Sequence, residues 1–375
     1  MARRNLRVRV DGRGRLEVVD PGFDSLDVLR EVDPDFGVRQ APIEGFIAPR
    51  FQALREAQCA VRRTLLPEVS ETSLWELHRA ESWPDNRPDR ASVLELKIEI
   101  ARRILYRCRL CARRCGVNRH AGEAGVCGLG PAALVAEHFV HIGEEPPINP
   151  SLVLSLAGCG LRCRYCQQGD ILDPRAVAAE PLSAELWSRL DAQGARTLSF
   201  VGGNPDESLY GVLRFLNAAP RAWRLPVVWN CHAYATPETL ELLEGAVDVW
   251  VPDLKYANES CALRLSGVSG YPGAAQTGIR AMLASNVPVI VRILVLPGHV
   301  ECCHFPALRF LRSVNRPNLL LSIRGQYCPD WRITAADGAL AERSAADEVR
   351  AVIAHADRLG LRFAGEQAVR SDCPW

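Results

Sequence analysis

Residues 152–169 read LVLSLAGCGLRCRYCQQG and join an apolar run to a tight group of three cysteines. The apolar run, residues 152–158, has the length and composition of a buried β-strand. Cys159, Cys163 and Cys166 follow it with C-x3-C-x2-C spacing. This stretch decides how the chain is interpreted, because it places three thiols at the end of a predicted strand.

Five further apolar runs follow the first one along the chain. They are residues 196–203, 226–230, 247–253, 287–295 and 318–324. Segments of helical length lie between them, among them residues 183–194, 206–219 and 236–246. Apolar strands that alternate with amphipathic helices indicate a parallel sheet covered by helices. Six such units predict an α/β fold, a partial (β/α)6 barrel, whose chemistry lies at the carboxyl ends of the strands.

The part of the chain before the barrel divides into two predicted regions. Residues 1–106 form an N-terminal extension without a functional signal. It has a hairpin-like alternation over residues 5–19 and a helical pattern over residues 91–105. Residues 107–147 form a cysteine-rich metal-binding segment, and residues 148–375 form the partial barrel.

The cysteine-rich segment contains CRLCARRCGVNRHAGEAGVC (108–127), in which four cysteines have C-x2-C-x3-C-x11-C spacing. These are Cys108, Cys111, Cys115 and Cys127. Four clustered thiolates usually bind either a tetrahedral zinc ion or an iron–sulfur cluster. We predict a metal site here of either kind; free cysteines packed against the barrel are the alternative.

Bulk composition excludes several classes of protein. The formal net charge of +1 gives no general attraction to nucleic acid or to an anionic membrane. No apolar run reaches the roughly 18 residues of a membrane span, and no signal-peptide core follows the start. We therefore expect a cytoplasmic protein with reduced cysteines. Fourteen cysteines in that compartment indicate metal binding and not a disulfide framework.

The three cysteines of the loop after the first strand predict an iron–sulfur cluster with an open position. Four cysteines complete an electron-transfer cluster, whereas three leave one iron without a protein ligand. Such an iron can bind a substrate or cofactor directly. A zinc knot or a chance grouping is the alternative, and the placement at a strand end disfavours it.

This loop resembles the signature of the radical S-adenosylmethionine (SAM) superfamily, including the aromatic Tyr165 before the last cysteine. The resemblance implies a [4Fe–4S] cluster on Cys159, Cys163 and Cys166, with SAM chelating the open iron. It also implies an oxidoreductase that cleaves SAM reductively and abstracts hydrogen through a 5′-deoxyadenosyl radical. A donor such as flavodoxin or ferredoxin would supply the electron.

A motif at the end of the second predicted strand extends the resemblance toward SAM binding. Gly202 and Gly203 stand in the place of the family's Gly-Gly-Glu motif, where bare backbone lets the SAM amino group approach. Asn204 occupies the position that is commonly acidic, so the resemblance implies a carbonyl contact in place of a charged one. A simple strand-to-helix turn is the alternative explanation for the two glycines.

Later strand ends carry polar residues that resemble SAM contacts. Asn230 in VVWN, and Asp253 with Lys255 in VPDLKY, resemble positions that contact the ribose and the carboxylate of SAM. His299 in LVLPGH looks like part of the turn that lines the adenine and substrate side. A solvated loop residue is the alternative for His299.

Five motifs carry a more specific resemblance: CGVNRHAGEAGVCG (115–128), HIGEEPPI (141–148), VDVWVPDLKY (247–256), VRILVLPGH (291–299) and GQYCP (325–329). With them, the stretch from residue 108 to about residue 365 resembles the pyruvate formate-lyase activating enzyme-like branch of the superfamily. That branch implies activation of a glycyl radical protein. Modification of a small metabolite or peptide is the alternative, and methyl transfer or sulfur insertion is a third possibility. A non-catalytic metal-binding module is a further alternative, and the neutral charge disfavours its nucleic-acid-binding form.

The remaining cysteines lack metal-ligand spacing and are predicted to be ordinary buried thiols. These are Cys59, Cys231, Cys261, Cys302, Cys303, Cys328 and Cys373. Of these, Cys302, Cys303 and Cys328 lie near the predicted open face and are weaker candidates for substrate contacts.

Two other pairs of residues admit more than one interpretation. Tyr327 and Trp331 either line a substrate pocket or seal the barrel mouth. Glu144 and Glu145 precede two prolines, so a solvated extended linker is as good an interpretation as a catalytic role.

Overall fold

The computed structural model describes residues 8–10, 16–18, 49–80, 87, 89–329 and 332–365. Its centre is an eight-stranded sheet with the strand order β12-β11-β10-β9-β8-β6-β5-β7. Within the described residues, no helix is both long and apolar enough to cross a membrane.

Six parallel strands form most of this sheet. They are β6 (Ser151–Leu156), β8 (Thr197–Gly202), β9 (Val227–Cys231), β10 (Val249–Pro252), β11 (Val289–Leu294) and β12 (Leu319–Arg324). Each coincides with one of the six predicted runs, so the α/β fold with a mostly parallel sheet is confirmed. At one edge of the sheet, β5 (Leu134–His141) pairs antiparallel with β6, and β7 (Glu180–Pro181) pairs antiparallel with β5.

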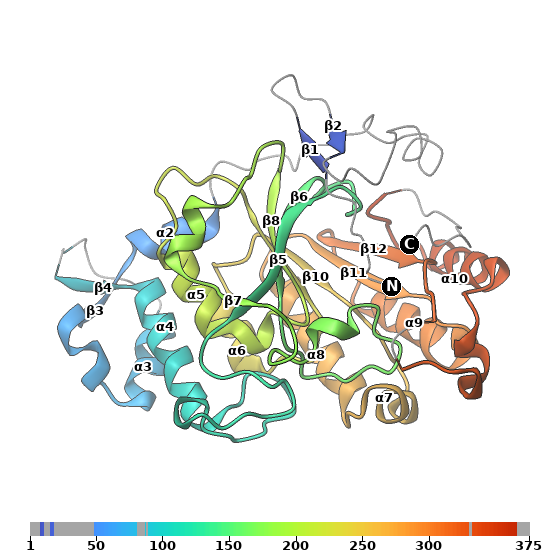
Figure 1. The fold of residues 1–375 in the computed structure, drawn as a ribbon, viewed down its shortest axis with the longest axis horizontal. Coiled ribbons are helices and arrows are strands. Elements are labelled where there is room, and N and C mark those ends of the chain that lie inside the picture. Colours follow the sequence, from blue (N-terminus) through green and yellow to red (C-terminus); the bar gives the residue numbers. More distant parts are fainter. Residues whose placement is uncertain are drawn as a thin grey trace.

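Helices cover the sheet between and after the strands (Figure 1). They are α5 (Leu209–Asn217), α6 (Pro237–Leu243), α7 (Glu259–Ser266), α8 (Tyr271–Ala284), α9 (Phe305–Ser313) and α10 (Ala346–Arg358). The helices predicted over residues 206–219 and 236–246 correspond to α5 and α6.

The prediction of a helix over residues 183–194 is wrong, because only a short 3-10 turn, Ala184–Ser188, forms there. Tertiary packing explains the difference. The Trp187 ring stacks on Phe215 of α5 with ring centroids 4.0 Å apart, and its indole N–H donates to the Phe215 carbonyl at 2.9 Å. These contacts fix the segment against α5, and local helix propensity is too weak to override them.

The N-terminal region contributes a smaller unit built around one amphipathic helix. Its elements are α2 (Arg50–Glu56), β3 (Gln58–Arg62), α3 (Glu71–His78), β4 (Arg90–Ser92) and α4 (Val93–Ile104). The strands β1 (Val8–Val10) and β2 (Leu16–Val18) form a separate two-stranded sheet that contacts β5. β1 and β2 pair antiparallel, as the predicted hairpin requires; its residues 5–7, 11–15 and 19 lie outside the described residues.

Helix α4 confirms the helical pattern over residues 91–105 and joins the N-terminal region to the barrel. It begins with a capping box in which the Ser92 hydroxyl accepts from the Glu95 backbone N–H at 3.1 Å, while the Glu95 carboxylate accepts from the Ser92 N–H at 2.7 Å. Its apolar side packs against α5 and α6 (Figure 1).

The strand register places a set of polar residues on one face of the sheet. Asn230 pairs with Val251, and Asp253 pairs with Arg292. Because alternate residues of a strand share a face, Asn230, Asp253 and Arg292 lie on the same side. A small apolar cluster that includes Ile148, Val228 and Val251 fills part of this face.

A buried ion cluster also uses this face. Glu145 is 3 % exposed, and its carboxylate contacts Arg292 at 2.6 Å and Arg324 at 2.7 Å. Glu144 also forms an ion pair with Arg292. The solvated linker is therefore excluded as an interpretation of these two glutamates: they hold the segment after β5 against β11 and β12.

The arginines keep the Glu145 carboxylate ionised in spite of its burial. Burial by itself would raise the pKa, but Arg292 and Arg324 lower the pKa of Glu145 to about 2 from its ordinary value of 4.5. A folded-state pKa below the unfolded value means that the ion cluster stabilises the fold above about pH 4.5. This stabilisation is lost as the pH falls toward about 2.

We expect Glu145→Gln to lower the free energy of unfolding by about 3 kcal/mol at neutral pH, because it leaves a buried arginine with fewer partners. Urea unfolding followed by circular dichroism measures the difference. The gap between the variant and the wild type should narrow as the pH falls below about 4.5. Glu180→Gln, which removes an exposed pair with Arg189, is the control and should remain near the wild type. A gap that does not change with pH would contradict this account.

Candidate functional site

The loop that follows β6 brings the three predicted cluster cysteines together. Cys159 and Cys163 are buried, and Cys166 is partly exposed. Burial, the nearby Glu207 carboxylate and the other two thiols raise the pKa of Cys159. The Cys166 N–H donates to the Cys163 carbonyl at 3.2 Å, which folds the loop back on itself.

The C-terminal end of α7 holds the other side of this loop. The backbone N–H groups of Arg162 and Arg164 donate to the carbonyls of Ser266 and Leu265, at 3.3 and 2.8 Å. These carbonyls belong to the last turn of the helix, where backbone acceptors have no partner within the helix.

Side chains of the same region form a hydrogen-bonded chain that ends on a cysteine. The Tyr256 hydroxyl lies 2.6 Å from the Ser266 hydroxyl, which lies 2.9 Å from Cys163 Sγ. All three residues are buried. When Cys163 is a thiolate, it can only accept, so Ser266 must donate to it.

Tyr165 belongs to a buried aromatic group beside the loop. Its ring packs edge-to-face on Tyr256 and Tyr327, at centroid distances of 6.3 and 6.2 Å. The Tyr327 hydroxyl donates to the Leu340 carbonyl at 2.7 Å, and the residue is buried. Trp331 lies outside the described residues.

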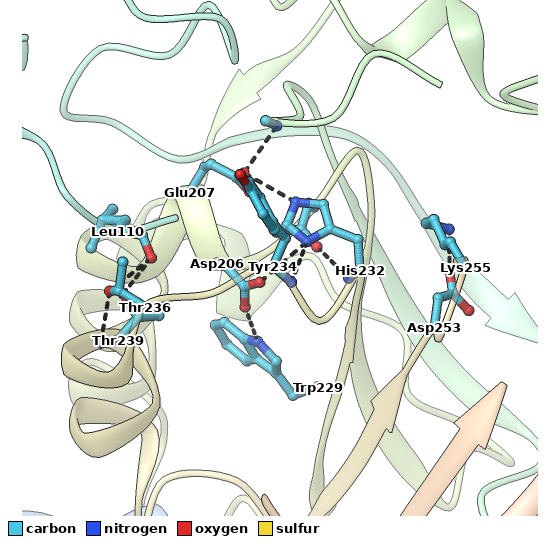
Figure 2. Close-up of polar contacts among 12 residues, drawn as sticks. Leu110, Asp206, Glu207, Trp229, His232, Tyr234, Thr236, Thr239, Asp253 and Lys255 are labelled. Carbon is cyan, nitrogen blue, oxygen red and sulfur yellow. Dashed lines mark hydrogen bonds and ion pairs between the residues drawn. The ribbon is translucent and has the colours of Figure 1, made fainter. Parts of the chain in front are cut away.

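Lys255 and Asp253 form an ion pair of 2.7 Å just after β10 (Figure 2). Burial opposes the charge of Lys255, but Asp253 and Cys163 outweigh this effect and raise its pKa. The ammonium is therefore protonated, and it also interacts with Cys166. Asn230 lies on the same face of the sheet as Asp253. Three of the predicted SAM contacts, Asn230, Asp253 and Lys255, therefore lie in one region.

Gly202 and Gly203 allow two strand ends to approach closely. A Cβ on Gly202 would lie 2.5 Å from the Leu156 backbone nitrogen, and one on Gly203 would lie 2.1 Å from the Gly158 carbonyl oxygen. Gly202 also has a φ of +98°. Close packing against the residues that lead into the cysteine loop therefore requires both glycines.

A buried polar network follows these glycines (Figure 2). Glu207 accepts from the Gly160 N–H at 2.9 Å and contacts His232 Nε2 at 3.2 Å. Asn204 donates its amide N–H to Glu207 and accepts from the His232 backbone N–H at 2.9 Å. Burial alone would raise the pKa of Glu207, but His232 and Asn204 lower it.

Sequence analysis missed Glu207 and His232. The signal available for Glu207 was its place in VGGNPDES, three residues after Asn204. Nothing in the sequence indicated that this carboxylate bonds to the backbone of the cysteine loop, because that contact joins residues 47 positions apart.

The upstream cysteine segment packs directly against the same loop. Cys108, Cys111 and Cys127 are buried, and Cys115 is exposed. A Cβ on Gly160 would lie 3.3 Å from Cys111 Sγ, so the two cysteine-rich segments are in contact.

Buried Arg119 links the upstream segment to the polar network. It contacts Cys127 Sγ at 3.2 Å and donates to the Glu207 carbonyl at 2.7 Å. Burial raises the pKa of Cys108 to about 11, and the positive charge of Arg119 opposes this effect. The arginine therefore supplies a cation that would stabilise thiolates in this segment.

His299 is buried, which excludes the interpretation of this residue as a solvated loop histidine. Its Nδ1 lies 2.8 Å from the Pro297 carbonyl, and its Nε2 lies 3.2 Å from an Arg264 guanidinium nitrogen. The side chain is thus fixed between the turn after β11 and helix α7.

A third group of cysteines was not predicted. Among the described residues, a single group of three metal-ligand side chains has all donor atoms within 4.8 Å of one another, and it consists of Cys261, Cys302 and Cys303. Sequence analysis treated these residues as separate thiols; Cys373, treated in the same way, lies outside the described residues. The sulfurs of Cys159, Cys163 and Cys166 do not all lie within this distance of one another.

Comparison with known proteins assigns the chain to a family. Residues 153–311 match the sequence profile of the Radical SAM superfamily. The uncharacterized protein MJ0674 of Methanocaldococcus jannaschii is 31 % identical over 276 residues, a match that covers 69 % of this chain and 80 % of that protein. The chain therefore belongs to the radical SAM superfamily, whose cofactors are a [4Fe–4S] cluster and SAM.

Solved structures show weaker likenesses. Streptococcus suis SuiB bound to its precursor peptide SuiA aligns with a TM-score of 0.37 and 13 % identity, over 55 % of this chain and 46 % of that one. TYW1 with a lysine-pyruvate adduct aligns with a TM-score of 0.35 and 12 % identity, over 56 % and 73 % of the two chains. The chain spans less than half of the SuiB structures that it matches.

We expect Glu207→Ala to loosen the cysteine loop, because the Gly160 N–H and the His232 ring both lose a buried acceptor. Hydrogen–deuterium exchange of the peptide that contains residues 157–166 measures this and should become faster. Glu207→Gln is the matched control: it keeps a carbonyl acceptor for Gly160 and should exchange more slowly than the alanine variant. Equal exchange in all three proteins would show that the carboxylate does not hold the loop.

Proposed function

We propose that this protein is a radical SAM enzyme of the pyruvate formate-lyase activating enzyme-like branch, with its cluster held by Cys159, Cys163 and Cys166. The observation that carries the proposal is the arrangement of these three thiols in one loop at the carboxyl end of β6. When bound and reduced, the cluster and SAM supply a 5′-deoxyadenosyl radical that abstracts hydrogen from a substrate.

The donor set of the loop supports this assignment. Cysteine thiolates are the ligands that iron–sulfur clusters prefer. The loop offers three of them, and the protonated Lys255 interacts with two of them, Cys163 and Cys166. A cation at this position offsets part of the negative charge that thiolate ligands bring into a buried site.

The remaining residues suit a bound SAM molecule. Lys255 offers an ammonium group for the SAM carboxylate, and Asp253 orients that group. Asn230, on the same face, offers an amide for the ribose hydroxyls. Because the Asn204 amide oxygen already accepts from the His232 backbone N–H, the SAM amino group is left to backbone carbonyls near Gly202 and Gly203.

His299 is assigned a supporting role on the adenine and substrate side. Its ring is oriented by the Pro297 carbonyl and by Arg264, so it presents a fixed surface to a ligand. Tyr165 is assigned to the wall behind the cluster, where Tyr256 and Tyr327 pack on it.

We assign the upstream cysteines to a second metal site. They are Cys108, Cys111, Cys115 and Cys127. The contact between Cys111 and Gly160 favours a function that serves the first site, either as a zinc support for the loop or as a second cluster that relays electrons. Zinc and iron analysis of a Cys115→Ala variant distinguishes the two, and eight irons per wild-type chain would favour a second cluster.

The substrate proposed first is the glycyl residue of a partner protein, with an electron donor such as flavodoxin or ferredoxin. Modification of a small metabolite or a peptide is the second candidate. Both use the same SAM cleavage, so the first experiment addresses that step alone.

We expect anaerobically reconstituted protein with a strong reductant to form 5′-deoxyadenosine from SAM. A variant with alanine at Cys159, Cys163 and Cys166 should form none, because it cannot hold the cluster. Liquid chromatography with mass spectrometry measures the product. Cys59→Ala removes a buried thiol of β3 and serves as the matched control, with activity like the wild type. Product from the triple variant, or none from iron-loaded wild type, would contradict the proposal.

We expect Ser266→Ala to make the reduction potential of the cluster more negative. Loss of a hydrogen bond to the Cys163 sulfur removes a contact that favours the reduced, more negative form. Redox titration followed by electron paramagnetic resonance measures the potential without turnover. Tyr256→Phe keeps the serine in place and should shift the potential less in the same direction. An unchanged potential in Ser266→Ala would argue against Cys163 as a ligand.

A further inference from the structure

The third cysteine group is built from two segments that are distant in sequence. Cys261 lies on α7, and Cys302 and Cys303 lie on a π-helical turn, Val300–His304, that follows β11. Cys302 Sγ lies 3.8 Å from Cys261 Sγ and also 3.8 Å from Cys303 Sγ. Cys261 and Cys303 are buried, and Cys302 is partly exposed.

These separations match those of sulfurs that share one metal ion. Zinc binds thiolate sulfur at about 2.3 Å with tetrahedral geometry, which places two ligand sulfurs about 3.8 Å apart. A disulfide needs a sulfur–sulfur distance of about 2.0 Å, much shorter than the observed values. The three cysteines therefore already have the spacing of a thiolate site for one metal ion, without any movement of their side chains.

The π-helical turn explains how two consecutive cysteines both reach α7. The His304 N–H donates to the His299 carbonyl at 3.1 Å, five residues back, and the Cys303 N–H donates to the same carbonyl at 3.0 Å. Such wide turns are rare and occur frequently at functional sites.

The nearby histidines do not complete the site. The His304 Nε2 accepts from the Leu296 N–H at 3.0 Å, and both ring nitrogens of His299 contact other groups. The chain therefore supplies three sulfur ligands, and a fourth position is left for water or another small ligand. The partial exposure of Cys302 gives an ion a route to the sulfurs.

We propose that Cys261, Cys302 and Cys303 bind one thiophilic d10 cation of the Zn²⁺ class, at a site separate from the cluster loop and from the upstream cysteines. Thiolate ligands select soft or borderline cations over Mg²⁺ and Ca²⁺. Binding replaces three S–H protons by three metal–sulfur bonds, and the three protons pass to the solvent.

The ion would tie α7 to the turn after β11. The other end of α7 carries Leu265 and Ser266, whose carbonyls accept from the cysteine loop after β6. A metal-anchored α7 therefore gives that loop a fixed support. The site makes no use of SAM and does not depend on the proposed reaction.

Zinc binding to the full chain tests the site. Anaerobically reconstituted protein is incubated with excess Zn²⁺, desalted and analysed for zinc and iron by mass spectrometry. We expect the wild type to retain one zinc ion more per chain than a variant with alanine at Cys261, Cys302 and Cys303, with equal iron in both. Cys59→Ala is the control for the loss of a buried thiol and should retain zinc like the wild type.

A single substitution tests the site independently, in case the triple variant does not fold. Cys302→Ser changes one partly exposed ligand, and we expect at least a tenfold loss of affinity in competition with a zinc chelator. Replacing Zn²⁺ by Co²⁺ should give sulfur-to-cobalt charge-transfer absorption that is weaker in Cys302→Ser. Equal zinc retention by the wild type and the triple variant, or unchanged affinity in Cys302→Ser, would overturn the site.

Discussion

The cysteine loop after β6 has almost no regular structure, so hydrogen bonds from neighbouring elements must hold its backbone. Glu207 accepts from the N–H of Gly160, and the last carbonyls of α7 accept from those of Arg162 and Arg164. Buried backbone donors are costly to leave without partners. A carboxylate on one side and a helix end on the other thus fix the geometry of three thiols that the loop alone could not position.

The other two cysteine groups are also linked to this loop, through contacts that help to hold it. The upstream segment contacts it through Cys111 against Gly160, and Arg119 joins that segment to the Glu207 carbonyl. The third group includes Cys261 of α7, and the opposite end of that helix supports the loop. The 14 cysteines therefore cannot be understood from spacing alone, because two of their groups are neighbours of the first in space and not in sequence.

Buried apolar runs predicted the six parallel strands, because strands covered on both faces must be apolar along their length. The grouping of Cys159, Cys163 and Cys166 in one loop was also predictable, since the three residues lie within eight positions of the sequence. The Glu207–His232 network and the group around Cys261 depend on how helices pack on the sheet, which no local pattern encodes. The helix expected over residues 183–194 failed for the same reason, because the stacking of Trp187 decided its conformation.

Charge balance explains why a lysine occupies position 255 in a chain that otherwise uses arginine almost throughout. Asp253 and the thiols of Cys163 and Cys166, when they are ionised, bring negative charge into a largely buried region, and a nearby cation offsets it. An arginine would present a broad planar fork that matches the Asp253 carboxylate in two-point contact. The compact ammonium of Lys255 binds one carboxylate oxygen of Asp253 at 2.7 Å and keeps further donors for a second anion. A bound amino-acid carboxylate is an anion of the required size, so the choice of lysine favours a ligand of this kind over a purely structural ion pair.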